Sequence, residues 1–368
     1  MIVALVGLLG APALAATLTV DPADGAAYPT IGAAVAASSS GDTIQVAAGT
    51  YAECIDPDGR DLIFSGPGVT VDGSGLCSAV FTVDAGEQVT LEDVVLTNAT
   101  GRGLVVVDST VALTRVVISG AGTADASGGA LYGSGGTLVL TECVFAENTA
   151  SEGGAIYLYR GTSLSDTGSR FEGNTATTGA GGAINLYWEH NAEFVDTHFE
   201  GNTAAGSSGG AIGASWSTTL RLEDTTFVDN TASGSGGGVY LYALSTTVEV
   251  LRSTFDGNTA QSGWGGALES EWYSSLDIVG STFSGNTADR TGGAVGLWYQ
   301  AAMNVQDTVF VGNQSVSDGG GALAFQPDER DVWPLTVDGS TFENNTAAGN
   351  GGAVAASRRP GPASRTVA

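Results

Sequence analysis

Residues 199–212 read Phe-Glu-Gly-Asn-Thr-Ala-Ala-Gly-Ser-Ser-Gly-Gly-Ala-Ile, and the two phrases in this stretch return along most of the chain. The Phe-x-x-Asn phrase begins at Phe145, Phe171, Phe199, Phe227, Phe255, Phe283, Phe310 and Phe342. The Gly-Gly phrase begins at Gly128, Gly153, Gly181, Gly209, Gly236, Gly265, Gly292, Gly320 and Gly351. Successive Phe residues are 26 to 32 positions apart. Such a period is typical of stacked repeat proteins, in which each unit buries its apolar face against its neighbours.

The residues inside one period alternate between aliphatic and other side chains. Examples are Ile156-Tyr157-Leu158-Tyr159, after one Gly-Gly, and Leu220-Arg221-Leu222, before one Phe. This period of two indicates short strands with one buried face. The 56 glycines oppose helices, at roughly 1 kcal/mol each. We therefore predict an all-β fold, a single parallel β-helix of about ten to twelve rungs.

Stacked rungs turn each repeated position into a column. We expect the Phe column to stack in the interior. We expect the Asn column to lie at a corner in left-handed backbone, with amides bonded from rung to rung, so that Asn230→Ala costs about 1–3 kcal/mol. A third column, two residues before each Phe, is expected to form its own hydroxyl ladder; it holds Cys143, Ser169, Thr197, Thr225, Ser253, Ser281, Thr308 and Ser340.

The paired Gly-Gly-Ala-Ile and Phe-x-x-Asn phrases, over residues 128–354, resemble the repeats of the chlamydial polymorphic outer-membrane proteins. That family lies within the pectin-lyase-like group of right-handed β-helices. The resemblance implies a right-handed parallel β-helix and a secreted or surface-displayed protein, often an adhesin, associated with the outer membrane. The enzymes of the wider group imply the alternative, a polysaccharide lyase or a glycoside hydrolase.

The two ends of the chain differ from the repeats. Residues 1–15 are predicted to be a signal peptide, because a short apolar run precedes Ala13-Leu14-Ala15; a buried first strand is the alternative. The β-helix is expected over 16–356, with a short helix at Ala33–Ala37 covering its open end. Residues 357–368 are rich in Arg and Pro. They predict a disordered tail on a truncated chain, because a solenoid end needs a cap.

The composition limits the classes of partner that we expect the chain to bind. The formal net charge is −27, and the chain has twelve Arg and no Lys. This acidity argues against nucleic acid as a partner. No stretch of the mature chain is long and apolar enough for a transmembrane segment. Cys54 and Cys77 are 23 residues apart, close to one turn, so they either form a disulfide between neighbouring rungs or remain two separate thiols.

Aromatic side chains recur at the outward positions of the strand that follows each Gly-Gly. A contiguous exposed aromatic surface usually marks a contact site, here for a glycan or a cell-surface protein. The predicted ribbon is edged by Glu189, Glu269 and Glu271. The alternative is that loops fold over these rings. The predicted binding residues are Tyr157, Tyr159, Tyr187, Trp188, Trp216, Tyr240, Tyr242, Trp272, Tyr273, Trp298 and Tyr299.

No catalytic residue, metal site or cofactor is predicted. Of the two histidines, His198 occupies an outward position, and His190 lacks a third group to complete a catalytic set. A carboxylate pair for glycoside hydrolysis must lie about 5 to 10 Å apart. Glu189 is about three rungs from Glu269 and Glu271, or near 14 Å. A non-catalytic binding protein is therefore favoured over an enzyme.

Overall fold

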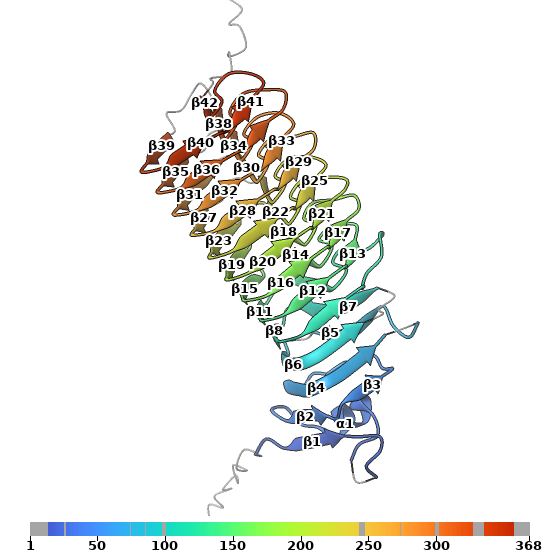
Figure 1. Ribbon diagram of the computed structural model, residues 1–368. Helices are drawn as coiled ribbons and strands as arrows, with labels where there is room; N and C mark the ends of the chain where they lie inside the picture. Colours follow the sequence, from blue (N-terminus) through green and yellow to red (C-terminus); the bar gives the residue numbers. More distant parts are fainter. Residues whose placement is uncertain are drawn as a thin grey trace, which may run out of the picture.

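The fold is a single coil of short strands. The computed structural model describes residues 14–25, 27–73, 75–84, 86–97, 101–242, 247–272, 274–298, 302–326 and 335–356. Most of the predicted signal peptide, residues 1–13, and the predicted tail, 357–368, lie outside the described residues. Strands from Thr17 to Ala356 wind through about 12 turns, and Figure 1 shows them stacked from the blue to the red end. The prediction of an all-β fold, a single parallel β-helix, is confirmed.

The described strands form three sheets in which every pairing is parallel, because a coil wound in one direction brings each strand beside its equivalent in the next rung. Sheet A holds β1 Thr17–Val20, β2 Thr43–Val46, β3 Gly49–Tyr51, β4 Leu62–Asp72, β6 Gln88–Thr97, β8 Thr110–Thr114, β9 Val117–Ser119, β11 Thr137–Thr141, β12 Val144–Ala146, β15 Ser163–Thr167, β16 Arg170–Glu172, β19 Asn191–Val195, β20 His198–Glu200, β23 Thr219–Glu223, β24 Thr226–Val228, β27 Thr247–Leu251, β28 Thr254–Asp256, β31 Ser275–Val279, β32 Thr282–Ser284, β35 Ala302–Gln306, β36 Val309–Val311, β39 Leu335–Asp338 and β40 Thr341–Glu343.

Sheet B holds β5 Ala79–Val83, β7 Arg102–Val107, β10 Leu131–Ser134, β14 Ile156–Tyr159, β18 Ile184–Tyr187, β22 Ile212–Ser215, β26 Val239–Tyr242, β30 Leu268–Glu271, β34 Val295–Trp298, β38 Leu323–Gln326 and β42 Val354–Ala356. Sheet C holds β13 Thr149–Ala150, β17 Thr175–Ala176, β21 Thr203–Ala204, β25 Thr231–Ala232, β29 Thr259–Ala260, β33 Thr287–Ala288, β37 Gln314–Ser315 and β41 Thr346–Ala347. Each regular repeat passes once through sheet B, twice through sheet A and once through sheet C.

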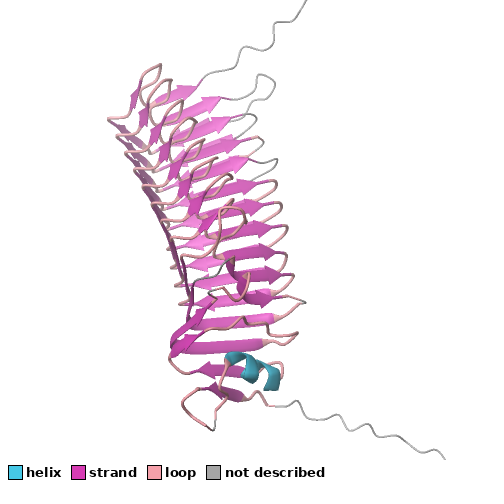
Figure 2. Ribbon diagram, turned by 90° about the vertical axis from the view of Figure 1, so that its right-hand side faces the viewer, coloured by secondary structure: helices cyan, strands magenta, loops and turns pink. Residues whose placement is uncertain are grey.

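The one described helix, α1 (Ile31–Ala37), covers the first rung, as predicted. Its N-cap is Thr30, whose Oγ1 accepts a hydrogen bond from the N–H of Ala33 at 3.1 Å. One face of the helix, made of Ile31, Ala34 and Val35, is buried in the core. Figure 2 shows the helix beside the first strands of the coil, where it shields the apolar end from water.

The interior Phe column stacks as predicted. Neighbouring rings from Phe145 to Phe342 lie 4.6 to 5.0 Å apart between centroids, with interplanar angles of 4° to 11°. Leu96 and Ile118 continue the column toward the N-terminus, since Ile118 is in register with Phe145 and Leu96 is in register with Ile118. The stack buries seven of its eight rings fully and Phe342 in part, and hydrophobic burial of this kind is the main favourable term in folding.

The Asn column forms the predicted amide ladder. Asn202 donates to Oδ1 of Asn230 from both its backbone N–H, at 3.0 Å, and its Nδ2, at 2.9 Å. The same Nδ2 donates to the carbonyl of Phe171 at 2.8 Å. The left-handed backbone predicted for these Asn residues is wrong, because the residue before each Asn adopts it, as Gly201 (φ 62°) and Asp229 (φ 52°) do. The chain turns one residue early, which leaves the Asn side chain pointing inward to the ladder.

The Ser/Thr column does not form the predicted hydroxyl ladder. Ser253 Oγ accepts a hydrogen bond from the N–H of Thr225 at 3.2 Å and donates to the carbonyl of Leu251 at 2.9 Å. Ser281 Oγ accepts from the N–H of Ser253 in the same way. These hydroxyls therefore bond to main-chain groups at the bend between the two sheet A strands, where the turn leaves backbone groups without strand partners.

One buried residue interrupts the apolar interior of sheet A. Asp166, in β15, is paired in register with Leu140 and Phe194 and is 0% exposed. Its Oδ2 accepts a hydrogen bond from the hydroxyl of Thr197, whereas its Oδ1 has no partner among the described residues. Burial raises the pKa of Asp166 to about 6.

The cysteines occupy two environments. Cys54 and Cys77 are joined by a disulfide with Cα atoms 6.1 Å apart, and the adjacent Ile55 bridges to Phe81 in the neighbouring rung. Cys143 is buried in the small-residue column, where burial raises the pKa of its thiol to about 11. A thiol with so high a pKa is a packing residue, because the thiolate is the reactive form.

Candidate functional site

In strands β14 to β34 of sheet B, the second residue points away from the interior, yet a loop lies over it. This loop joins sheet C to the next Gly-Gly, and a Cβ atom on Gly213 would lie 2.7 Å from the Cβ of Ala180 in it. Tyr157 is consequently only 8% exposed, and Glu269 is 0% exposed. The predicted surface position of Tyr157 is therefore wrong. Tyr240 is half-buried for the same reason.

The fourth residue of each strand and the residue after it remain outside this cover. They form what we call the aromatic strip: Tyr159, Tyr187, Trp188, Trp216, Tyr242 and Trp272. The rings of Tyr159 and Tyr187 stack with centroids 6.0 Å apart, and those of Trp216 and Tyr242 meet edge to face at 5.8 Å. Figure 1 shows the sheet B strands β14, β18, β22 and β30, at whose ends most of these residues lie, stacked along the coil.

The remaining predicted ring positions differ from the strip. Trp298 is half-buried, because its indole packs against that of Trp264 with centroids 4.6 Å apart. Tyr273 and Tyr299 lie outside the described residues. Loop cover, the alternative expected from the sequence, thus applies to one of the two outward columns. In the other column Tyr242 is exposed, and Tyr159, Tyr187 and Trp298 are half-buried.

Three Trp residues of the strip adopt left-handed backbone. Their φ angles are 84° at Trp188, 58° at Trp216 and 57° at Trp272, and in an earlier rung Gly135 holds the equivalent place after its strand (φ 73°). A side chain in this region costs roughly 1–2 kcal/mol. The three indoles nevertheless remain 37% to 44% exposed. Neither backbone preference nor burial explains why Trp stands at this corner.

A hollow of about 340 Å³ lies at the N-terminal end of the strip. Its lining residues are Gly135, Arg160, Gly161, Trp188 and Glu189. The guanidinium of Arg160 lies over the rings of Tyr159, at 5.3 Å, and of Trp188, at 5.9 Å. The hollow thus combines an aromatic wall, a cation and a carboxylate, and sequence reasoning missed Arg160.

Arg160 differs from most other arginines of this acidic chain. Arg115, Arg170, Arg221 and Arg252 each pair with carboxylates on the outer face of sheet A. Arg160 makes ring contacts but no ion pair or side-chain hydrogen bond within the part of the chain that the structure describes. Its five N–H donors are consequently available in the hollow.

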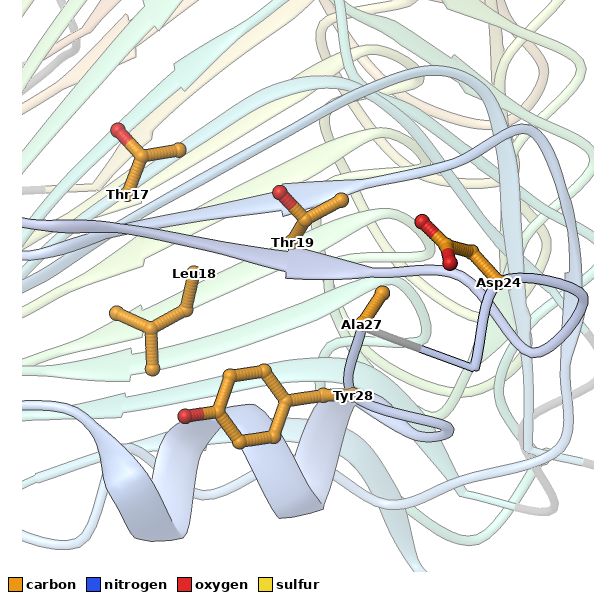
Figure 3. A pocket seen from close by; sticks show the side chains of 6 residues that line it. All are labelled: Thr17, Leu18, Thr19, Asp24, Ala27 and Tyr28. Atoms are coloured by element: carbon orange, nitrogen blue, oxygen red, sulfur yellow. The ribbon is translucent and has the colours of Figure 1, made fainter.

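A second hollow, of about 330 Å³, lies at the N-terminal end of the coil. Figure 3 shows Tyr28 and Leu18 on the side of strand β1 that faces α1, with Thr17 and Thr19 on the opposite side. Asp24 is its one charged lining residue. This hollow has no residue of the aromatic strip and marks the junction between the cap and the first rung.

The acidic residues predicted to edge the ribbon lie in three settings. Glu189 lines the hollow beside Trp188, whereas Glu271 is half-buried and Glu269 fully buried. Burial is the main cause that raises the pKa of Glu269 well above its usual value, and burial also raises that of Glu271. Strand register places Glu189 three rungs from Glu271, as predicted.

One of the two histidines points out of the coil, and the other is buried. His198 points outward, as predicted, and bonds to Thr226 and Glu200. His190 is buried at a corner, with Nδ1 3.2 Å from the carbonyl of Thr162. Burial lowers the pKa of His190, so this ring is neutral at physiological pH. Across the described ranges, no three His, Cys, Asp or Glu side chains gather as metal ligands would.

Comparisons with known families agree with the geometry. The model of the right handed beta helix region matches residues 78–283. The model of the Chlamydia polymorphic membrane protein repeat matches residues 339–357. No curated protein matches the chain. In the described part of the chain, no helix has both the length and the apolar character needed to cross a membrane.

Proposed function

The chain belongs to the right-handed β-helix family, and we propose that it is a secreted or cell-surface protein that binds a glycan through the aromatic strip and leaves it chemically unchanged. The match to a polymorphic membrane protein repeat favours a surface or outer-membrane-associated protein. The fold alone is shared by binding proteins and enzymes, so the proposed activity depends on the strip.

The observation that carries this proposal is the left-handed backbone at Trp188, Trp216 and Trp272. Left-handed backbone at non-glycine residues recurs at other corners of the coil, such as Arg115 and Arg252. The three Trp residues are set apart because a large aromatic ring stays exposed at this costly position, and strain of this kind persists where another requirement holds it. The three indoles follow strands of a single sheet, so they lie along one face of the coil. With rungs about 4.8 Å apart, Trp188 and Trp216 offer stacking platforms one rung apart, and Trp272 offers a third platform two rungs further on.

The hollow beside Trp188 favours a glycan over a protein surface as the ligand. A sugar ring presents an apolar face and a rim of hydroxyl groups. Trp188 supplies a flat apolar wall, while Arg160 donates and Glu189 accepts hydrogen bonds at the rim. Pockets that bind small polar molecules combine an apolar wall with a few polar groups in this way.

Hydrolysis of the glycan finds less support in the same site. Glycosidases place two carboxyl groups about 5 to 10 Å apart around the scissile bond. The hollow is lined by one carboxylate, Glu189. Glu269 is covered by its loop, which keeps it from a substrate on the strip. Binding without turnover is the function that this arrangement supports best.

Replacing Trp188, Trp216 and Trp272 together with Gly is expected to abolish glycan binding, because the stacking platforms are removed. Nucleic-acid bases stacked on aromatic side chains contribute about 1–3 kcal/mol each, and we expect a similar gain for sugar rings. The loss should therefore be roughly a hundredfold or more in affinity. The measurement is a glycan array followed by calorimetry with the best ligand, beside assays for reducing sugar and unsaturated uronate.

The same triple variant should keep its stability within about 1 kcal/mol, because the left-handed strain that Gly relieves offsets the partial burial that the three rings lose. The matched control is Val139→Ala, an exposed apolar residue on sheet A, which should leave binding unchanged. Undiminished binding in the triple variant would remove the strip from the proposal. Release of sugar products by the wild-type protein would show an enzyme instead.

A further inference from the structure

Glu269 is a buried carboxyl without a counter-charge. It stands at the second position of β30, under the covering loop, and is 0% exposed. Neither Oε1 nor Oε2 has a hydrogen-bond partner among the described residues. The equivalent residues of the two flanking strands, Tyr240 and Gly296, are uncharged at neutral pH. An ionised carboxylate in this setting would be strongly unfavourable.

The backbone leaves a space that this carboxyl fills. A Cβ atom on Gly296 would lie 1.8 Å from Oε2 of Glu269, and one on Gly265 would lie 2.8 Å from it. Gly265 ends the covering loop of this rung, residues 261–265, which we call the cover. The carboxyl is therefore held between the cover and the next strand, where no room remains for a hydration shell.

The cover is attached to the rungs on either side by main-chain and side-chain hydrogen bonds. Gln261 and Ser262 donate to the carbonyls of the preceding rung, and the carbonyls of the last three cover residues accept from the N–H groups of Arg290, Gly236 and Gly237. The N–H of Trp264 donates to Ser235 Oγ at 3.1 Å, and the N–H of Gly265 donates to the carbonyl of Thr291 at 3.0 Å. The indole of Trp264 packs on Trp298, and the guanidinium of Arg290 lies 5.0 Å from the Trp264 ring. Opening the cover would break these contacts and leave the strands of sheet B paired.

Few other charged or titratable groups face this carboxyl. Glu271 follows on the same face of β30, and the hydroxyl of Tyr240, from β26, lies 3.4 Å from a Glu271 oxygen. Asp289 and Arg290 belong to the next covering loop, and Arg290 contacts the outer side of Trp264. Strand β34 and the cover itself carry no titratable side chain. Negative charge on Glu271 adds to the cost of ionising Glu269.

We propose that Glu269 is a proton-controlled latch, whose protonated carboxyl permits the cover to close and whose ionisation opens the cover and exposes the Trp264–Trp298 pair. The proton released on opening goes to water, and the carboxylate gains the hydration that the closed form denies it. This proposal is independent of glycan binding by the aromatic strip.

The direction of the pH dependence follows from the burial. The pKa of Glu269 in the closed form is raised well above the value of 4.5 for an exposed carboxyl. A group with a raised pKa stabilises the closed form fully below its exposed pKa, and this contribution is lost as the pH rises through the raised pKa. The cover should therefore be closed in acid and open at alkaline pH.

The test is amide hydrogen exchange of the full chain, read by mass spectrometry on peptides that span residues 261–268, for wild type and Glu269→Gln at equal pH. The carboxamide has nearly the same shape but cannot ionise. At about pH 5 the two proteins should exchange alike, whereas at about pH 9 the wild type should exchange roughly tenfold faster or more. Glu271→Gln is the matched control and should keep the wild-type difference between the two pH values.

Several results would overturn the latch. One is a ratio of the wild-type to the Glu269→Gln exchange rate in the cover that is the same at about pH 5 and at about pH 9. Another is closure of the wild-type cover at about pH 9 by added Ca²⁺, which would show that a cation and not a proton neutralises the site. If Glu269→Gln exchanges rapidly throughout the chain, Glu269→Met replaces it. Fluorescence quenching by acrylamide, lost in Trp264→Phe, gives a second reading of opening.

Discussion

Asn230→Ala is expected to lower the free energy of unfolding by about 4 kcal/mol, because several buried groups lose their partners at once. Oδ1 of Asn230 accepts two hydrogen bonds from Asn202, through its backbone N–H and its Nδ2. Nδ2 of Asn230 donates to the carbonyl of Phe199 and to Oδ1 of Asn258. The loss exceeds the value expected from a single amide pair, since the ladder also carries main-chain groups that no strand satisfies.

The measurement is chemical denaturation followed by circular dichroism. Asn345→Ala is the matched control, because Asn345 lies in the last described rung, where it is half-buried and water reaches it. Its replacement should cost about 1 kcal/mol. Equal losses for the two variants would show that burial in the ladder contributes little to stability.

Asp166→Leu is expected to raise the free energy of unfolding by about 3 kcal/mol at neutral pH. The carboxyl of Asp166 is fully buried beside Leu140 and Phe194, and burial raises its pKa to about 6 from an ordinary value of 3.8. Each pKa unit corresponds to about 1.4 kcal/mol, so near neutral pH the ionised side chain costs roughly 3 kcal/mol. Leu removes the charge and matches the interior column.

The wild type should therefore lose stability as the pH rises. The folded pKa lies above the unfolded one, so the contribution of Asp166 is complete below about pH 4 and is lost as the pH passes about 6. Asp166→Leu and Asp166→Asn should both remove this dependence, and Asn controls for volume. Parallel pH profiles of wild type and Asp166→Asn would contradict the assignment.

Columns are the part of this fold that sequence predicts best. A repeat fixes which residues meet across rungs, so Phe199 on Phe227 and Asn202 on Asn230 follow from the period alone. The backbone conformation of individual residues is harder to predict from the sequence. The corner turn falls on Gly201 rather than Asn202, because the sequence does not show at which residue the chain reverses.

The candidate site was harder to predict than the core. Alternation correctly assigned Tyr157 and Tyr159 to the outer side of β14, but only Tyr159 escapes the loop. A loop that folds back over a strand leaves no periodic signal. One sign was available, since Gly213 and Gly296 share a column with Tyr157, and small residues recur where backbone approaches closely.

Asp166 and Glu269 were overlooked for a related reason. Asp166 follows Leu164 by two positions, so the same alternation that predicts a strand places it inside. Aligning the rungs would have set it between Leu140 and Phe194. Glu269 was expected at the surface because charged side chains are usually exposed. Its burial depends on the cover, which is a tertiary feature.

The amide ladder has a consequence for how such a chain changes over generations. Each Asn offers the same acceptor to the preceding rung and the same donors to the following one, from Asn148 to Asn313. Duplication of one 28-residue unit, such as the unit from Phe199 to the next Phe, creates no new type of junction. It adds about 4.8 Å of reach. Gene duplication and deletion can therefore change the length of the coil one rung at a time, without altering how neighbouring rungs are joined.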